Sequence, residues 1–146
     1  VKRGFDAACV DYMQKQNIIK NPVKDFLWHV VRKFTNFPKY MTYNKYSQDI
    51  VSHFKPLEKF IPCIGPNFDH SPRSRNRGVI LLGSTPQKWY NLCCAIFNKV
   101  KSRHHEENIV VIKSWNEWGE GNYLEPDLQY GKQYIDATRK ALDETK

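Results

Sequence analysis

NIVVIKSWNEWGEGNYLEPD, the stretch from Asn108 to Asp127, joins a continuous apolar run to a segment rich in carboxylates and aromatic rings. An apolar run of this kind is typical of a parallel strand that is covered on both faces. The polar segment, Ser114 to Asp127, holds two tryptophans, a tyrosine, three glutamates and an aspartate. A surface loop needs charges but not rings, and a core needs rings but not charges. The combination therefore indicates a site that directly follows a strand.

Strands and helices alternate along the rest of the chain. The predicted elements are a helix over 21–34 capped by Asn21, a strand or ordered loop over 39–46, a short helix capped by Ser47, a buried strand opening into a loop over 59–69, a strand over 79–82, a helix capped by Ser84 or Thr85 with a buried stripe from Trp89 to Val100, and a last helix over 129–142. In the helix that starts at Ser84 or Thr85, Gln87 is placed to complete a capping box with Ser84. In the last, Tyr134 and Leu142 belong to the apolar side.

This alternation favours an α/β fold with a parallel sheet and helices packed over it. In open α/β sheets and in (β/α)8 barrels alike, ligands bind at the carboxyl edge of the strands. A full barrel needs about 250 residues, so we expect the 146 residues to form one incomplete domain over 1–146, the carboxyl-terminal strands and helices of such a barrel.

Composition narrows the class of protein. Hydrophobic residues make up 40% and aromatic residues 14%, which excludes a disordered chain. No stretch approaches the roughly 18 apolar residues of a membrane span. The formal charge of +8 favours an anionic partner such as nucleic acid, acidic polysaccharide or the surface of a membrane. The sequence says nothing of the oligomeric state.

Cysteine and histidine spacing points to no metal site. The four cysteines are Cys9, Cys63, Cys93 and Cys94, and they form no CxxC pair. The histidines offer no set of ligands either, so we predict no metal and no other cofactor. Free thiols favour a reducing, cytoplasmic compartment.

Glu117 and Glu120 are the candidate catalytic pair. In a continuing strand, side chains three residues apart point to opposite faces, so the two carboxylates converge only if the chain turns after Trp118. Gly119 and Gly121 give the backbone that freedom. The competing interpretation is a solvated pair of glutamates beside core tryptophans.

Paired carboxylates at the mouth of a sheet suit glycosidic chemistry. One group donates a proton to the departing oxygen, and the other stays ionised. Indole and phenol rings provide flat apolar faces on which the C–H face of a sugar packs. The residues therefore predict a carbohydrate site.

The motif Trp115 to Asp127 resembles the signature of the WbsX-type glycosyltransferases and of glycoside hydrolase family 99-like proteins. Further matches are YGKQYIDA at 130–137, GFDAA at 4–8, PCIGPNFDHSPR at 62–73 and STPQKW at 84–89. The resemblance implies a (β/α)8 barrel that acts, with retention of configuration, on α-linked, mannose-like glycans or on bacterial surface polysaccharide, as in lipopolysaccharide biosynthesis.

By the same resemblance, Glu117 would deprotonate the sugar 2-hydroxyl, which attacks the anomeric carbon. Glu120 would act as general acid and then as general base. The implied substrate-binding residues are Asp69, Arg73, Trp115, Asn116, Trp118, Tyr123 and Glu125. Arg73 could instead brace Asp69 by a bidentate pair, and Glu125 could brace its own loop. The chain departs from the family pattern at Gly119, where family 99 hydrolases carry histidine, and at Phe68, where tryptophan is usual.

Three other functions stay open at this stage. A nucleic-acid binder would use the basic runs at 73–77 and 99–105, but neither belongs to a recognisable motif, so we expect no nucleic-acid partner. A sugar-binding protein without catalysis would bind a sugar through the aromatic rings and would not act on a glycosidic bond. A transferase would pass the sugar to an alcohol instead of water.

Overall fold

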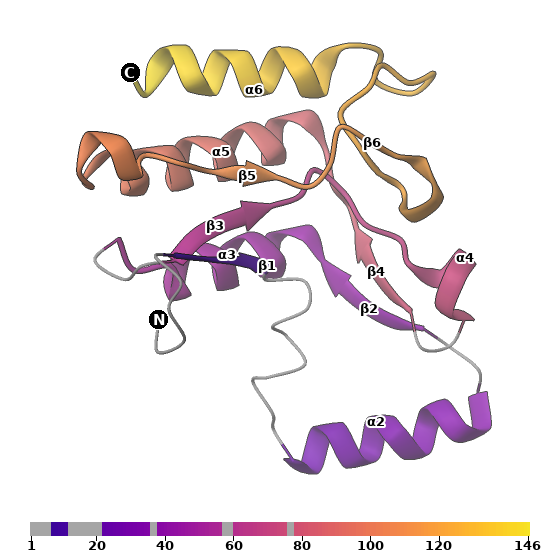
Figure 1. Cartoon of the computed structure of the whole chain (residues 1–146). Helices are drawn as coiled ribbons and strands as arrows, with labels where there is room; N and C mark the ends of the chain where they lie inside the picture. The colour runs from indigo at the N-terminus through magenta and orange to yellow at the C-terminus, as the bar shows by residue number, and fades with distance from the viewer. Residues whose placement is uncertain (1–6, 12–21, 36–37, 57–59, 76–77) are drawn as a thin grey trace.

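Three parallel strands carry the fold in the computed structural model, which describes residues 7–11, 22–35, 38–56, 60–75 and 78–146. The strands are β1 (Ala8–Asp11), β3 (Phe60–Ile64) and β5 (Val111–Ile112), and they lie side by side in that order (Figure 1). Helix α3 (Tyr43–His53) precedes β3, and α5 (Pro86–Lys101) precedes β5. Consecutive strand–helix units are therefore neighbours in space. The predicted α/β class with parallel strands is confirmed, and closure into a barrel stays a prediction.

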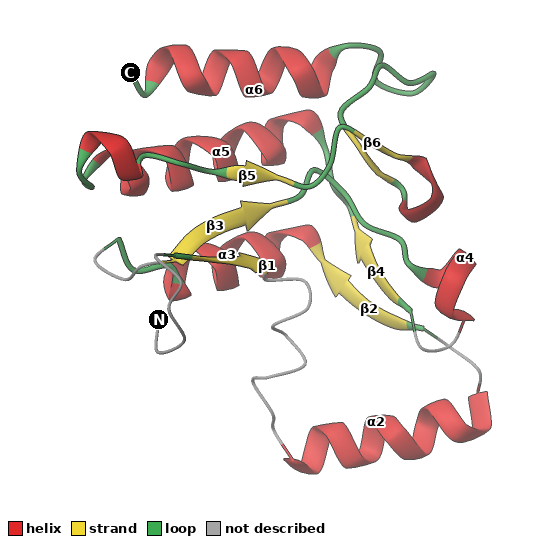
Figure 2. Ribbon diagram, in the orientation of Figure 1, coloured by secondary structure: helices red, strands yellow, loops and turns green. Residues whose placement is uncertain are grey.

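A second, smaller sheet forms from the long connections that leave the carboxyl ends of β1 and β3. It pairs β2 (Lys39–Thr42) with β4 (Val79–Leu82), again in parallel. Helix α2 (Pro22–Thr35) precedes β2, and the short α4 (Ser71–Ser74) lies between β3 and β4. Figure 2 shows this sheet beyond the tip of β3. The connections thus build a structured layer at the edge where ligands bind in such folds.

The N-cap of helix α3 lies five positions before the predicted cap Ser47. Thr42 is the N-cap, and its hydroxyl accepts a hydrogen bond from the Lys45 amide at 3.3 Å. The prediction of a strand or loop reaching Tyr46 is wrong for a physical reason. The Tyr43 hydroxyl donates to the Gly65 carbonyl, and the Tyr46 hydroxyl accepts from the Gly65 amide, both at 2.9 Å. Contacts with a distant loop therefore fix these tyrosines as the first helical turn.

Helix α5 matches its predicted apolar stripe, since Trp89, Leu92, Cys93, Ile96 and Val100 are buried. Thr85 caps it by accepting a hydrogen bond from the Lys88 amide at 3.3 Å. The predicted capping box is wrong. Ser84 donates its hydroxyl to the Pro66 carbonyl, and the Gln87 side chain donates to Asn91.

Helix α6 (Gln133–Glu144) packs on α5 and starts four residues after its predicted start at 129. A turn around Asp127 causes the delay. The Asp127 carboxylate accepts from the amides of Gln129 and Tyr130, and Gly131 closes the turn with a φ of 54°. Tyr134 is buried as expected, whereas Leu142 is 49% exposed, so its assignment to the buried side is wrong.

Two apolar faces are exposed, and one of them belongs to a strand that the sequence pattern predicts to be covered on both faces. Val111 in β5 is 37% exposed and Ile109 before it is 48% exposed, so the described residues cover one face of this strand and not both. The apolar face of α2 is open as well, with Phe26 68% and Phe34 81% exposed. The predicted cap of this helix, Asn21, lies outside the described residues, as do 4–6 of the GFDAA match.

No disulfide forms among the described residues; Cys63 and Cys93 are buried, and Cys9 is exposed. Among the described residues, no helix combines the length and apolar composition needed to cross a bilayer.

Candidate active site

A tight hairpin turns the chain just past Trp118. Strands β6 (Asn116–Glu117) and β7 (Asn122–Tyr123) pair in antiparallel fashion, and the 3₁₀ turn η3 (Trp118–Glu120) joins them. Gly121 ends the turn with a φ of 55°, in the left-handed region that glycine adopts without penalty. The turn that the two glutamates require is therefore present.

Ser114 and Asn122 hold the base of this hairpin. The Ser114 hydroxyl donates to the Asn122 carbonyl at 2.7 Å and accepts from the Glu117 amide at 3.1 Å. The Ser114 amide donates to the Asn122 side-chain oxygen at 3.1 Å. Asn122 is fully buried. Neither residue is singled out by the sequence patterns, because their role is visible only once the two strands pair.

Arg73 brings the two carboxylates together. Its Nη2 lies 3.1 Å from Glu117 Oε1, and its Nη1 lies 3.2 Å from Glu120 Oε1. A planar guanidinium suits this double contact. The suggested bidentate brace from Arg73 to Asp69 does not form. Asp69 instead accepts hydrogen bonds from the amide and the hydroxyl of Ser71, at 2.8 and 2.6 Å.

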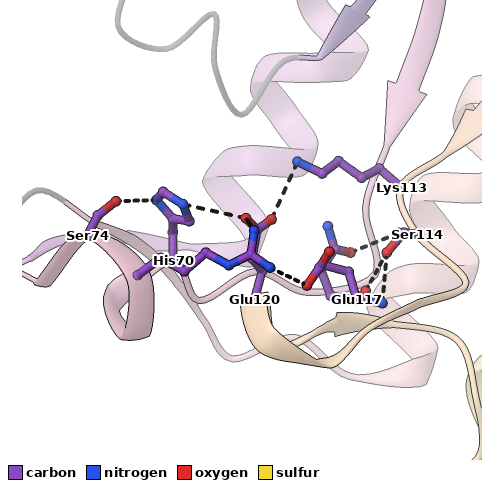
Figure 3. A network of polar contacts seen from close by, with 8 residues as sticks. His70, Ser74, Lys113, Ser114, Glu117 and Glu120 are labelled. Carbon is purple, nitrogen blue, oxygen red and sulfur yellow. Dashed lines mark hydrogen bonds and ion pairs between the residues drawn. The ribbon is translucent and has the colours of Figure 1, made fainter.

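Glu120 is the more enclosed of the two carboxylates, with 10% of its side chain exposed against 37% for Glu117. Lys113 Nζ lies 3.6 Å from its Oε2, and His70 Nε2 lies 3.5 Å from its Oε1. Figure 3 shows these two side chains approaching Glu120 from different sides. Burying a charge is costly unless it is paired, and these contacts provide the pairing.

The neighbours of Glu120 are themselves positioned. His70 Nδ1 lies 2.9 Å from the Ser74 hydroxyl, and its ring stacks on Phe68 at 5.7 Å between centroids. Lys113 Nζ lies 5.3 Å from the centre of the same Phe68 ring. Sequence reasoning missed Lys113 altogether. The signal that could have found it is its place directly after β5, at the edge where ligand contacts gather.

The aromatic residues of the hairpin form a platform beside the carboxylates. Trp118 stacks on Tyr123 with 3.7 Å between ring centroids and 14° between planes. Trp118 Nε1 donates to Glu125 Oε2 at 2.6 Å. Glu125 therefore braces its own loop, which is one of the two roles that the sequence left open for it. Trp115 and Trp118 are 55% and 49% exposed.

The remaining predicted residues lie nearby with looser connections. The Asp69 amide donates to the Glu120 carbonyl at 2.7 Å, which ties the β3–β4 connection to the turn. Asn116 is exposed at the start of the hairpin. Within the described residues, the side chains of Asn116 and Trp115 make no hydrogen bond to Glu117 or Glu120. Their proposed contact with substrate stays a prediction.

Most basic residues at the end of α5 bind the protein's own backbone. Lys99 donates to the Val51 carbonyl at 2.5 Å, and Arg103 donates to the carbonyls of Pro56 and Phe60 at 2.8 and 2.7 Å. A nucleic-acid-binding surface would leave such cations available to contact phosphates, whereas these cations bind backbone carbonyls. The described residues contain no cluster of three histidines, cysteines or carboxylates able to hold a metal ion.

Residues 1–138 match the family described as glycosyltransferase WbsX. The chain is also 34% identical over 91 residues to proteins from two strains of Xanthomonas campestris pv. campestris, each named uncharacterized protein WxcX. Those alignments cover 60% of this chain and 13% of each relative, so the chain spans a small part of their length. A solved structure named glycoside hydrolase-like protein is similar over 68% of this chain and 29% of its own, with 19% identity and a TM-score of 0.44.

Proposed function

The chain belongs to the glycosyltransferase WbsX family, and from that membership we propose that Glu117 and Glu120 act on a glycosidic bond in a carbohydrate-active enzyme. One observation supports this proposal above the others. The two carboxylates converge on the Arg73 guanidinium at 3.1 and 3.2 Å, at the carboxyl edge of a parallel sheet. Paired carboxylates at that edge are the groups that glycosidic chemistry uses.

The resemblance to family 99-like hydrolases supplies the proposed roles of the two groups. Glu117, the more exposed carboxylate, takes the proton from the 2-hydroxyl of the sugar, and the 2-oxygen attacks the anomeric carbon. Glu120 gives its proton to the departing oxygen as the glycosidic bond breaks. In the second step Glu120 takes a proton from water or from an acceptor alcohol, whose oxygen opens the anhydro ring, and Glu117 returns a proton to the 2-oxygen. Two inversions at one carbon give net retention.

The rings give the sugar a surface. Half-exposed indoles at Trp115 and Trp118 present apolar faces suited to the C–H side of a pyranose. An α-linked, mannose-like glycan or a bacterial surface polysaccharide is the proposed substrate. The polysaccharide could be assembled by transfer or shortened by hydrolysis, because the same acid and base serve both reactions.

We also propose that β1, β3 and β5 are consecutive strands of a (β/α)8 barrel, so that residues 1–146 form a single, incomplete domain of it. The parallel order β1–β3–β5 with intervening helices supports this. Within the described residues, the outer edges of β1 and β5 are not paired with a further strand. In a closed barrel both edges would be paired.

The chemistry is tested by incubating the protein with α-linked mannosides and with bacterial surface polysaccharide, with and without a nucleotide-sugar donor. We expect the new anomeric centre to keep the configuration of the substrate, as read by NMR of the first product formed. A strict requirement for the donor would identify a transferase. Inversion of configuration would contradict the proposed roles of the two glutamates.

A sugar-binding protein without catalysis is the second candidate, and one observation favours it. Arg73 and Lys113 both contact Glu120, the group that the mechanism needs as a proton donor. In a pure binding site, such ion pairs would hold the carboxylate as a fixed acceptor for sugar hydroxyls.

Replacing Arg73 by methionine separates the two candidates. The change removes both ion pairs, so the carboxylates lose their common anchor. In an enzyme we expect kcat to fall by about 10- to 100-fold, since misplacing catalytic groups by about 1 Å has effects of that order. Arg75→Met, at the end of α4, is the matched control, because Arg75 is exposed and contacts neither glutamate. A kcat within twofold of the parent would count against catalysis by this pair.

A further inference from the structure

A small polar cavity of about 130 Å³ lies behind the turn that carries Glu120. The β3–β4 connection, the hairpin, the turn after it and α6 all contribute to its walls, which include Asn67, Ser84, Gly121, Tyr123, Asp127 and Tyr134. The cavity is well below the roughly 300–1,000 Å³ of sites for drug-sized ligands. It can therefore hold little more than one small ring.

Hydrogen bonds fix the orientation of the hydroxyls on one wall. The Ser84 hydroxyl donates its single hydrogen to the Pro66 carbonyl at 2.5 Å. The Tyr134 hydroxyl, 2.9 Å from Ser84 Oγ, must then be the donor in that contact. Burial raises the pKa of Tyr134 to about 12, so the phenol is neutral at physiological pH. Its oxygen keeps lone pairs that can accept a hydrogen bond.

Two other residues of the cavity lining, Asn67 and Tyr123, offer complementary groups. Asn67 Oδ1 accepts from the Phe68 amide at 2.9 Å, and within the described residues the Asn67 side-chain nitrogen has no hydrogen-bond partner. Two N–H donors are thus available. The Tyr123 hydroxyl lies 3.2 Å from Asp127 Oδ2 and donates to it, which leaves the oxygen of this phenol as an acceptor. A sugar hydroxyl both donates and accepts, so it fits a wall that offers both.

Residues of the hairpin link the cavity to the proposed reaction site. Gly121, which lines it, follows Glu120 in sequence, and Tyr123 stacks on Trp118 at 3.7 Å. We propose that this cavity is a subsite for one neutral sugar residue of the glycan, next to the residue on which Glu117 and Glu120 act. This inference rests on the proposed function of the neighbouring carboxylates. The Asp127 carboxylate in the wall disfavours a carboxylated or phosphorylated sugar, because like charges repel.

Binding measurements test the subsite without requiring turnover. We would titrate the protein with methyl α-mannopyranoside, an α-linked mannobiose and methyl glucuronide, and obtain each Kd by calorimetry. We expect saturable binding of mannobiose and at least tenfold weaker binding of the glucuronide. Tyr134→Phe and Asn67→Ala should each weaken mannobiose binding by about fivefold or more. Tyr90→Phe is the matched control: Tyr90 does not line this cavity and its hydroxyl bonds to Glu144 of α6, so the Kd should be unchanged.

The outcomes separate this inference from the proposed function. If both cavity variants bind mannobiose within twofold of the parent, or if the parent binds neither mannoside, the subsite is wrong. If Glu120→Gln retains full turnover while the cavity variants lose affinity, the subsite is supported and the catalytic roles proposed for Glu117 and Glu120 are wrong. Two cavity variants are needed because Tyr134→Phe also removes a hydrogen bond to Ser84.

Discussion

Glu120→Gln is expected to lower turnover of an α-linked mannoside by about 10²–10⁴-fold, the usual contribution of a positioned acid or base. Glutamine keeps the size of the side chain and can still contact its neighbours, but it cannot donate a proton to the departing oxygen. KM should change by no more than a few fold, because the sugar-stacking rings are untouched. Glu117→Gln should cause a loss of similar size, since the 2-hydroxyl then keeps its proton. Steady-state kinetics give both parameters.

Glu106→Gln is the matched control for both variants. Glu106 is exposed in the 3₁₀ turn η2 (His105–Glu107), which precedes β5, and its replacement should leave kcat unchanged. Circular dichroism would establish that all three variants are folded. If the parent is active and each active-site variant retains turnover within a few fold, the assignment of roles to Glu117 and Glu120 is wrong.

Trp89→Ala is expected to lower the free energy of unfolding by about 3–5 kcal/mol, the range measured for removing a large buried ring. Trp89 is fully buried in α5, and its Nε1 donates to Thr138 Oγ1 on α6 at 2.7 Å. The variant thus loses packing in the core and the hydrogen bond between the two helices. With a total stability of about 5–15 kcal/mol for typical domains, this change alone could unfold much of the protein. Urea denaturation followed by fluorescence and circular dichroism measures the difference.

Leu142→Ala provides the comparison on the neighbouring helix. Leu142 is 49% exposed, so its truncation should change the free energy of unfolding by about 0.5 kcal/mol or less. A loss below about 1 kcal/mol for Trp89→Ala would show that the α5–α6 interface is not the core that the structure describes.

Local patterns predicted α5 well because its signals lie within the helix. Its apolar residues recur on one face, and Thr85 with Pro86 marks its start. The start of α3 could not be predicted in the same way. The hydroxyls of Tyr43 and Tyr46 bond to Gly65, about twenty residues away in sequence, and no local pattern records that contact.

The candidate site likewise has one part that local patterns predict and one part that depends on distant contacts. Glu117, Glu120 and the turn between them were predictable because two glycines and two carboxylates lie within five residues. The surroundings of Glu120 were not. His70 and Arg73 come from the connection after β3, and Lys113 from the end of β5. Only the pairing of β3 with β5 brings these segments together.

The exposed faces of α2 and β5 show a different limit. The sequence predicts the helix over 21–34, yet Phe26 and Phe34 on it are more than half exposed. Periodicity identifies which face of a helix is apolar, and it does not identify what covers that face.

The central claim is that both carboxylates face one bound sugar, and a crystal structure of Glu120→Gln with an α-linked mannobiose tests it most directly. We predict that the glycosidic oxygen lies within about 3 Å of the amide of residue 120, and the 2-hydroxyl within about 3 Å of the Glu117 carboxylate, the reach that proton transfer requires. The second ring should occupy the cavity beside Tyr134. A disaccharide bound away from both residues, or one whose linkage reaches neither, would contradict the account.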